Sequence, residues 1–342
     1  PADVFHSKDA GRYDRMLELV KDLNCNMLRC WGGNVYEDHA FFDFCDQNGI
    51  MVWQDFAMAC GAYPQDENFL KAIKKEVKSV IKKLRNHPSI VVWCGDNECD
   101  YNYVARGIDP GKNKITRKIL PETAFENDPY RPFYNTSPYF SSEIAKMGPK
   151  GIYFTSEAHL WGARDYYKSR YYTESKACFI GEIGYHGCPN LSSIKKFIDE
   201  EYLWPWKDNR QWIIHATSSE GKEGPFSYRI ELMANQVKEM FGKIPDNLPD
   251  FIIASQITQA EAKKFFIEMS RVKKWERTGV LWWNVIDGWP QFSDAVVDYY
   301  FGRKLAYYYI KRVQQPVCII IDEPESWNVR VAACNDTLKD ID

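Results

Sequence analysis

The stretch ENFLKAIKKEVKSVIKKLRNHPSIVVWC (residues 67–94) decides the fold class. Apolar residues recur at helical spacing along its first part, which predicts an amphipathic helix over 67–86. His87 and Pro88 end that helix, and SIVVWC (residues 89–94) is then apolar throughout. A fully apolar strand after a long helix is typical of a parallel strand whose two faces are both covered.

The same alternation of helix and apolar strand continues along the chain. Further strands are predicted at residues 26–31, 50–56, 131–136, 177–183 and 279–286, and further helices at 9–23, 40–47, 256–278 and 303–314. About seven strands separated by helices indicate a (β/α)8 TIM barrel over residues 1–315, whose first strand we expect to lie before Pro1. A doubly wound open sheet is the alternative, but Gly32 and Gly33 do not form the glycine-rich turn that it requires. After Pro316, residues 317–321 and 327–334 alternate like antiparallel strands, so 316–342 is predicted to begin a following β-sandwich domain.

The composition limits the partners of the protein. The net charge is -3 and no basic tract occurs, so we expect no nucleic-acid partner. No apolar run reaches the roughly 18 residues of a membrane span, so we expect no membrane insertion. The ten cysteines include no C-x2-C pair, which predicts free thiols rather than a zinc site. The chain starts like a piece of something longer, which leaves lysosomal, periplasmic and cytoplasmic locations open.

Two glutamates follow directly on predicted strands or end them: Glu98 and Glu182. The carboxyl ends of barrel strands carry the catalytic residues, and glycoside hydrolysis needs two carboxylates, one protonated and one ionised. Paired acids also bind metals or form ion pairs, so these residues alone leave a glycosidase, another enzyme and structural pairing open. No histidine joins the acids Asp96, Glu98 and Asp100, so we expect no metal ion, and nothing indicates a cofactor.

Several segments resemble one enzyme family. SIVVWCGDNE (residues 89–98) resembles the acid/base strand of glycoside hydrolase family 2. Segments similar to its β-mannosidase branch lie before and after that strand, and together they occur in the family's order: NMLRCWGG (26–33) upstream, then FIGEIGYHGCP (179–189), LWWNVIDGWP (281–290) and YYYIKR (307–312). The resemblance covers most of residues 1–315. It implies a catalytic barrel that works with other domains of the same full-length chain.

The resemblance also implies roles for individual residues. Glu98 matches the general acid/base and Glu182 the nucleophile of a double displacement that retains configuration. Matches to sugar-binding positions are Arg29 beside the nucleophile, Trp31 and Trp283 in the pocket wall, Asn97 at the sugar 2-hydroxyl, and His159 and Trp161 in a His-x-Trp segment. The structural alternatives are a buried ion pair for Arg29 and core packing for the tryptophans. Retention predicts carboxyl groups about 5–5.5 Å apart, whereas inversion requires about 6.5–9.5 Å.

The chain departs from the family pattern near both glutamates. Asp96 stands where the family's Gly-Asn-Asn-Glu has its first Asn, and Gly181, Ile183 and His186 replace the residues usual around the nucleophile. These departures leave the chemistry in place and the sugar open. We interpret the chain as part of an exo-acting β-glycosidase for oligosaccharide or glycoside substrates, with β-mannosides favoured. The alternatives are a β-galactosidase, a β-glucuronidase, an exo-β-glucosaminidase, which the Asn97-Glu98 pair disfavours, or a non-catalytic carbohydrate-binding barrel.

Overall fold

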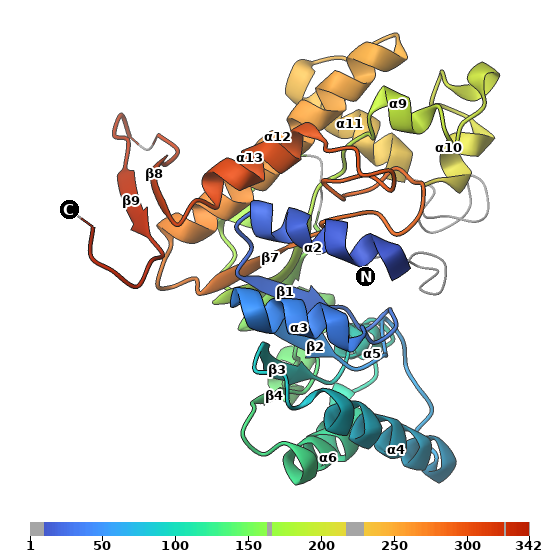
Figure 1. Cartoon of the computed structure of the whole chain (residues 1–342), viewed down its shortest axis with the longest axis vertical. Coiled ribbons are helices and arrows are strands. Elements are labelled where there is room, and N and C mark those ends of the chain that lie inside the picture. The colour runs from blue at the N-terminus through green and yellow to red at the C-terminus, as the bar shows by residue number, and fades with distance from the viewer. Residues whose placement is uncertain (1–9, 163–165, 217–228, 325, 342) are drawn as a thin grey trace. The chain divides into compact units, whose positions relative to one another are not determined.

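The computed structural model describes residues 10–162, 166–216, 229–324 and 326–341 (Figure 1). The predicted domains 1–315 and 316–342 therefore each include residues outside the described part. The chain divides into two compact units. The first contains Cys25–His159 and Lys176–Gly181, and the second contains Ala2–Asn24, Leu160–Ser175 and Glu182–Asp342.

The first unit is built on a parallel sheet whose strands follow the order β1-β2-β3-β4. The strands are β1 (Met27–Cys30), β2 (Met51–Asp55), β3 (Ile90–Cys94) and β4 (Phe133–Tyr134). Leu28 pairs with Val52, and Gln54 pairs with Trp93, so the strands run in register toward one edge. The predicted strands are confirmed here, although β4 is shorter than its predicted range. The carboxyl ends of all four strands meet at that edge, where the polar residues after each strand gather.

Helices lie between these strands in the chain and after the last of them. They are α3 (His39–Asn48), α4 (Glu67–Leu84), α5 (Cys99–Ala105), α6 (Leu120–Asn127) and α7 (Ser142–Ala145), with the short helical segments η2 (Pro110–Lys112), η3 (Ile115–Ile119) and η4 (Gly148–Phe154). Helix α4 confirms the prediction from residues 67–86. It begins where the Asp66 carboxylate accepts hydrogen bonds from the backbone N–H groups of Asn68 and Phe69. Its apolar face, including Val77 and Ile81, is buried.

A second sheet has the order β5-β6-β7. Its strands are β5 (Glu157–Leu160), β6 (Phe179–Gly184) and β7 (Gly279–Trp283), and the chain passes from the first unit to the second within β5 and within β6. Strands β6 and β7 agree with the predicted strands. Strand β5 was not predicted, because its four residues include the polar Glu157 and His159, which are both buried. A buried strand that contains charged residues does not show the apolar run on which the prediction relied.

The second unit is mainly helical. Its elements are η1 (Ala10–Arg12), α2 (Tyr13–Asp22), α8 (Arg170–Thr173), α9 (Leu191–Ile194), η5 (Glu200–Tyr202), α10 (Arg210–Ile214), α11 (Arg229–Phe241), α12 (Leu248–Val272) and α13 (Leu305–Val313). Helix α12 begins earlier than predicted because the Asn247 side chain accepts the backbone N–H of Asp250 and caps it. Trp212 stacks on Phe292 with ring centroids 4.1 Å apart, within the core that also buries Phe251. Helices α12 and α13 lie side by side (Figure 1).

An antiparallel hairpin follows α13. Strands β8 (Val317–Ile321) and β9 (Val331–Asn335) pair along their whole length, and Ile320 and Cys334 pack on Val272 at the end of α12. The first of the two predicted strands is confirmed, and the second begins four residues later than predicted, at Val331 rather than 327. The ten cysteines are thiols that form no disulfide with one another, as predicted. Within the described ranges, none of the helices combines the length and the apolar character needed to cross a membrane.

Candidate active site

Glu98 lies at the carboxyl edge of the first unit's sheet, in the turn between β3 and α5. Its backbone adopts a left-handed conformation with φ of 57°, which non-glycine residues seldom occupy and which collects at functional sites. The backbone N–H of Glu98 donates to the carbonyl of Ser137, 2.7 Å away, and so fixes the turn. The side chain is consequently held at the strand ends, where barrel enzymes place their chemistry.

The Glu98 carboxylate has two side-chain partners in the first unit. Oε1 accepts a hydrogen bond from Nδ1 of His159 at 2.8 Å, and Oε2 accepts one from the thiol of Cys60 at 3.4 Å. Burial opposes ionisation of Glu98, but the hydrogen bond and charge of His159, with smaller contributions from Cys60 and Arg29, lower its pKa below the ordinary value. The contact with His159 therefore favours the ionised form of Glu98.

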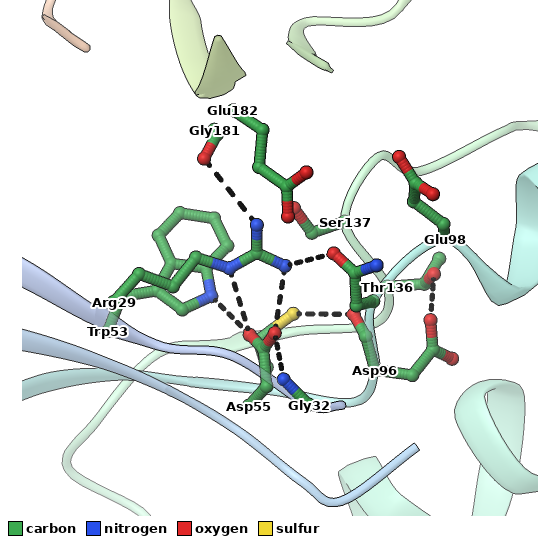
Figure 2. Close-up of polar contacts among 12 residues, drawn as sticks. Arg29, Gly32, Trp53, Asp55, Asp96, Glu98, Thr136, Ser137, Gly181 and Glu182 are labelled. Atoms are coloured by element: carbon green, nitrogen blue, oxygen red, sulfur yellow. Dashed lines mark hydrogen bonds and ion pairs between the residues drawn. The ribbon is translucent and has the colours of Figure 1, made fainter. Parts of the chain in front are cut away.

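Arg29, from β1, is the centre of a hydrogen-bond network at the same edge (Figure 2). Its guanidinium donates to both oxygens of Asp55, at 2.8 and 3.3 Å, and to Oδ1 of Asn97 at 2.9 Å. A longer bond of 3.5 Å reaches the carbonyl of Gly181, the residue directly before Glu182 in the chain. The buried ion pair with Asp55 is the structural role considered for Arg29, and the same side chain also orients the Asn97 amide.

Asp55, the ion-pair partner of Arg29, is held in place by other groups. It accepts further hydrogen bonds from the backbone of Gly32 at 3.0 Å and from the indole of Trp53 at 2.8 Å. Burial raises the pKa of Asp55, and the charge of Arg29 and these hydrogen bonds oppose that rise. The guanidinium is thus held by a rigid partner and has little freedom to turn away.

The second ring nitrogen of His159, a residue of β5, also has polar neighbours. Nε2 lies 2.9 Å from the hydroxyl of Ser137, 3.3 Å from Oε1 of Glu157 and 3.3 Å from Nη1 of Arg29. Sequence reasoning did not identify Glu157, Ser137 or Cys60. For Glu157 a signal existed, because residues 157 and 159 share a face once the segment is recognised as a strand.

In the second unit, Glu182 is hydrogen-bonded to a tryptophan. The indole N–H of Trp161 donates to Oε2 of Glu182 at 2.8 Å, and the rings of Trp161 and Trp283 meet edge to face, 6.3 Å apart. A Cβ at Gly184 would lie 2.6 Å from the Trp161 ring, so this ring packs directly on the backbone of β6. The Trp283 carbonyl accepts a hydrogen bond from Lys263, whose pKa burial lowers to about 7.

The remaining predicted residues are placed as follows. Trp31 follows β1 in the first unit, and its ring covers Gly33 so closely that a Cβ there would overlap it. His186, in the second unit, lies with its Nε2 3.5 Å from Asp294, which also contacts Arg229 at 3.5 Å. The first unit therefore brings together Arg29, Asn97, Glu98 and His159, and the second brings together Trp161, Glu182 and Trp283.

One group in the first unit has the residue types of a metal site away from these residues. Asp43, Asp46 and His87 approach one another closely enough to share an ion. Asp46 already accepts from His87 at 2.7 Å and from the backbone of Ser89 at 2.8 Å, and the second nitrogen of His87 contacts His39 at 2.8 Å. Through these hydrogen bonds the group connects α3 to the residues just before β3.

Comparison with known families assigns the chain. The model described as glycosyl hydrolases family 2, TIM barrel domain, matches residues 10–209, which is more than half of the sequence. The chain belongs to glycosyl hydrolase family 2. The parallel strands of the first unit agree with a TIM barrel, and the resemblance drawn from the motifs is confirmed.

Similar family 2 relatives carry β-mannosidase names. β-Mannosidase B of Aspergillus fumigatus is 31% identical over 99% of this chain and 41% of its own length, and β-mannosidase of Capra hircus is 29% identical over 93% and 38%. The crystal structure of a β-D-mannosidase from Dictyoglomus thermophilum is 35% identical, with a TM-score of 0.83 over 96% of this chain and 39% of that one. The chain thus spans about two-fifths of the length of these relatives. An exo-chitosanase of Amycolatopsis orientalis, 17% identical with a TM-score of 0.68 over 94% of this chain and 37% of that one, shares the fold.

The family 2 departure at Asp96 has a clear local structure. Asp96 is fully buried, and its Oδ1 accepts from the hydroxyl of Thr136 at 2.5 Å and from the backbone of Cys99 at 3.1 Å. Burial raises the pKa of Asp96 to about 7, against the opposing effect of the Thr136 hydrogen bond. Asp96 therefore stabilises the turn that carries Glu98 through these hydrogen bonds. The ionised form of Asp96 is unfavourable when buried, so its contribution to stability depends on pH.

Proposed function

We propose that the full-length protein is a retaining, exo-acting β-glycosidase that hydrolyses terminal β-mannosides by double displacement. The observation that carries the proposal is the placement of Glu98 at a strand end with a histidine hydrogen-bonded to it, in a family 2 chain whose named relatives are β-mannosidases. The second glutamate, Glu182, accepts a hydrogen bond from an indole N–H, which favours its ionised form.

The proposed roles follow from the local contacts. Glu182 attacks the anomeric carbon while Glu98 protonates the leaving oxygen, and Glu98 then takes a proton from the water that releases the sugar. The Glu98–His159 pair supplies the first proton, because His159 can pass it across their 2.8 Å hydrogen bond. Arg29 occupies the carbonyl side of the Asn97 amide, which leaves an N–H of that amide to donate to a sugar hydroxyl. Trp31, Trp161 and Trp283 supply flat apolar surfaces for the sugar ring.

The first test is turnover by the full-length protein. Aryl β-mannoside, β-galactoside, β-glucuronide and β-glucosaminide are compared between pH 4 and 8. We expect the mannoside to have the highest kcat/KM. Preference for another of these glycosides would keep the chemistry and correct the sugar, whereas no turnover of any of them would refute the proposal.

The two glutamates are then separated by their variants. Glu98→Ala should lose about 10²–10⁴-fold in kcat for a poor leaving group. With a dinitrophenyl β-mannoside, whose leaving group departs without a proton, azide should attack the glycosyl-enzyme in place of water and restore turnover, with a β-mannosyl azide as product. A 2-deoxy-2-fluoro mannosyl fluoride should label Glu182 covalently, and Glu182→Gln should not be labelled. An α-configured product from the wild type would contradict double displacement. The predicted carboxyl separation of about 5–5.5 Å is measurable in a crystal structure of the full-length protein.

The domain organisation is part of the proposal. We assign residues 1–315 to the catalytic (β/α)8 barrel and 316–342 to the start of a β-sandwich domain. The antiparallel pairing of β8 with β9 supports the second assignment, because barrel strands pair in parallel. Limited proteolysis of the full-length protein should cut between such domains and leave the β8–β9 segment with the downstream fragment.

A further inference from the structure

Glu157 is a buried carboxylate that the reaction outlined above does not use. It lies on β5 two residues before His159, and both side chains face the same way. The Glu157 side chain is 5% exposed and the His159 side chain 2% exposed. Oε1 of Glu157 accepts from the hydroxyl of Ser137 at 3.1 Å and lies 3.3 Å from Nε2 of His159. Among the residues that the structure describes, Oε2 of Glu157 has no hydrogen-bond partner.

Burial of a carboxylate with so few hydrogen-bond partners is unfavourable in free energy. Desolvation of the charge is compensated only where a cation or several donors face it. The imidazole of His159 is the group that Glu157 contacts and that can carry a positive charge. On its other side His159 donates to Glu98 at 2.8 Å. The three side chains therefore form a line, carboxylate to imidazole to carboxylate, which ends on the proposed acid/base.

The backbone opposite Glu157 is fitted to this carboxylate. A Cβ at Gly181 would overlap Oε1 of Glu157, and it would lie 2.9 Å from its Cδ and 3.2 Å from Nε2 of His159. Any side chain at position 181 would displace Glu157 or the imidazole. The absence of a side chain directly before Glu182 is thus what gives the Glu157 carboxylate its place.

We propose that Glu157 is a positioning residue for the acid/base: it holds the His159 imidazole against Glu98 and keeps a proton on that pair. Gly181 is required because a glycine leaves room for the Glu157 carboxylate. In the first half of the reaction the bond from the anomeric carbon to the leaving oxygen breaks as the bond from Glu182 to that carbon forms, and the His159 proton passes to Glu98 and on to the leaving oxygen. In the second half the oxygen of water bonds to the anomeric carbon as the bond to Glu182 breaks, and a proton of that water returns to Glu98 and then to His159. This inference rests on the proposed function.

Other charged and titratable groups of the first unit also lie near the Glu98–His159 pair and affect its protonation. Arg29 faces Nε2 of His159 at 3.3 Å and opposes a positive imidazole, but it is itself paired with Asp55. Cys60 contacts Glu98. Tyr134, whose pKa burial raises and Glu157 raises further, stays neutral. Removal of the Glu157 charge therefore lowers the proton affinity of the Glu98–His159 pair as a whole.

The test is the pH dependence of kcat/KM for an aryl β-mannoside with a poor leaving group, measured on the full-length protein. In Glu157→Gln the basic limb should move to lower pH by about one unit, while the acidic limb, which belongs to the nucleophile, stays in place. Glu157→Asp keeps the charge and should restore most of the wild-type limb. Glu143→Gln removes the same charge from an exposed position of the same unit and should leave the profile unchanged.

Gly181→Ala supplies an independent perturbation. It should move the basic limb in the same direction as Glu157→Gln, and in a Glu157→Ala background it should move it no further, because both changes act on one contact. If Glu157→Gln does not fold, as judged by thermal unfolding, Gly181→Ala and Glu157→Asp decide the matter. A wild type that turns over no glycoside refutes the proposed function and this inference with it. An active wild type whose variants keep the wild-type basic limb refutes this inference alone.

Discussion

Asp96→Asn should stabilise the protein at neutral pH and not in acid. Asp96 is fully buried next to the turn of Glu98, and burial raises its pKa to about 7. Between the ordinary carboxyl pKa near 4 and that value, the folded protein binds a proton that the unfolded chain has released. Stability is therefore lost as the pH rises through this window.

The magnitude follows from the pKa itself. Each pKa unit corresponds to about 1.4 kcal/mol, so a rise from about 4 to about 7 costs about 4 kcal/mol once Asp96 is ionised. The Asn amide keeps an acceptor for the hydroxyl of Thr136 and the backbone of Cys99 and carries no charge. The variant should thus equal the wild type near pH 4 and exceed it by up to about 4 kcal/mol above pH 7.

The assay is thermal unfolding of the full-length protein at intervals from pH 4 to 8. The difference in Tm between Asp96→Asn and the wild type should grow with pH and reach on the order of 5 °C. The control is Glu122→Gln, which removes the charge of an exposed carboxyl group on α6. A constant difference across the pH range, or a variant less stable than the wild type at pH 8, would refute the reasoning.

The other predictions concern the two glutamates. Trp161→Phe keeps a ring but loses the 2.8 Å hydrogen bond to Glu182, so kcat/KM for an aryl β-mannoside should fall about 10–100-fold; an unchanged value would exclude the role of that bond. Gly184→Ala places a methyl group within 2.6 Å of the same indole, so it should lower kcat/KM at least as much, and a smaller loss would show that the ring can shift at no cost. Iodoacetamide should alkylate the exposed thiol of Cys60 beside Glu98 and inactivate the enzyme, a bound inhibitor should protect it, and Cys60→Ser should be insensitive; equal inactivation of that variant would place the reactive thiol elsewhere.

Much of the first unit was predictable because its signals are local. The periodicity of residues 67–86 and the apolar run of 89–94 predicted α4 and β3 within two residues at each end. Strand β5 was missed because its buried side chains include an acid and a histidine. A polar residue in a buried strand carries information only when its partner is known, and the partners of Glu157 lie at Ser137 and His159 in the folded chain.

The sequence by itself determined which residues stand at the strand ends, because a strand's direction and length follow from its apolar run. It thereby placed Glu98 after β3 and Glu182 within β6, and it identified the family from the order of the motifs. Only the tertiary structure decided what surrounds them. Cys60 and His159 share the Glu98 carboxylate, Arg29 is paired with Asp55 and donates to Asn97, and Gly181 makes room for Glu157. Hydrogen bonds between residues so distant along the chain depend on sub-ångström distances set by the packing of separate strands, and no local pattern in the chain encodes them.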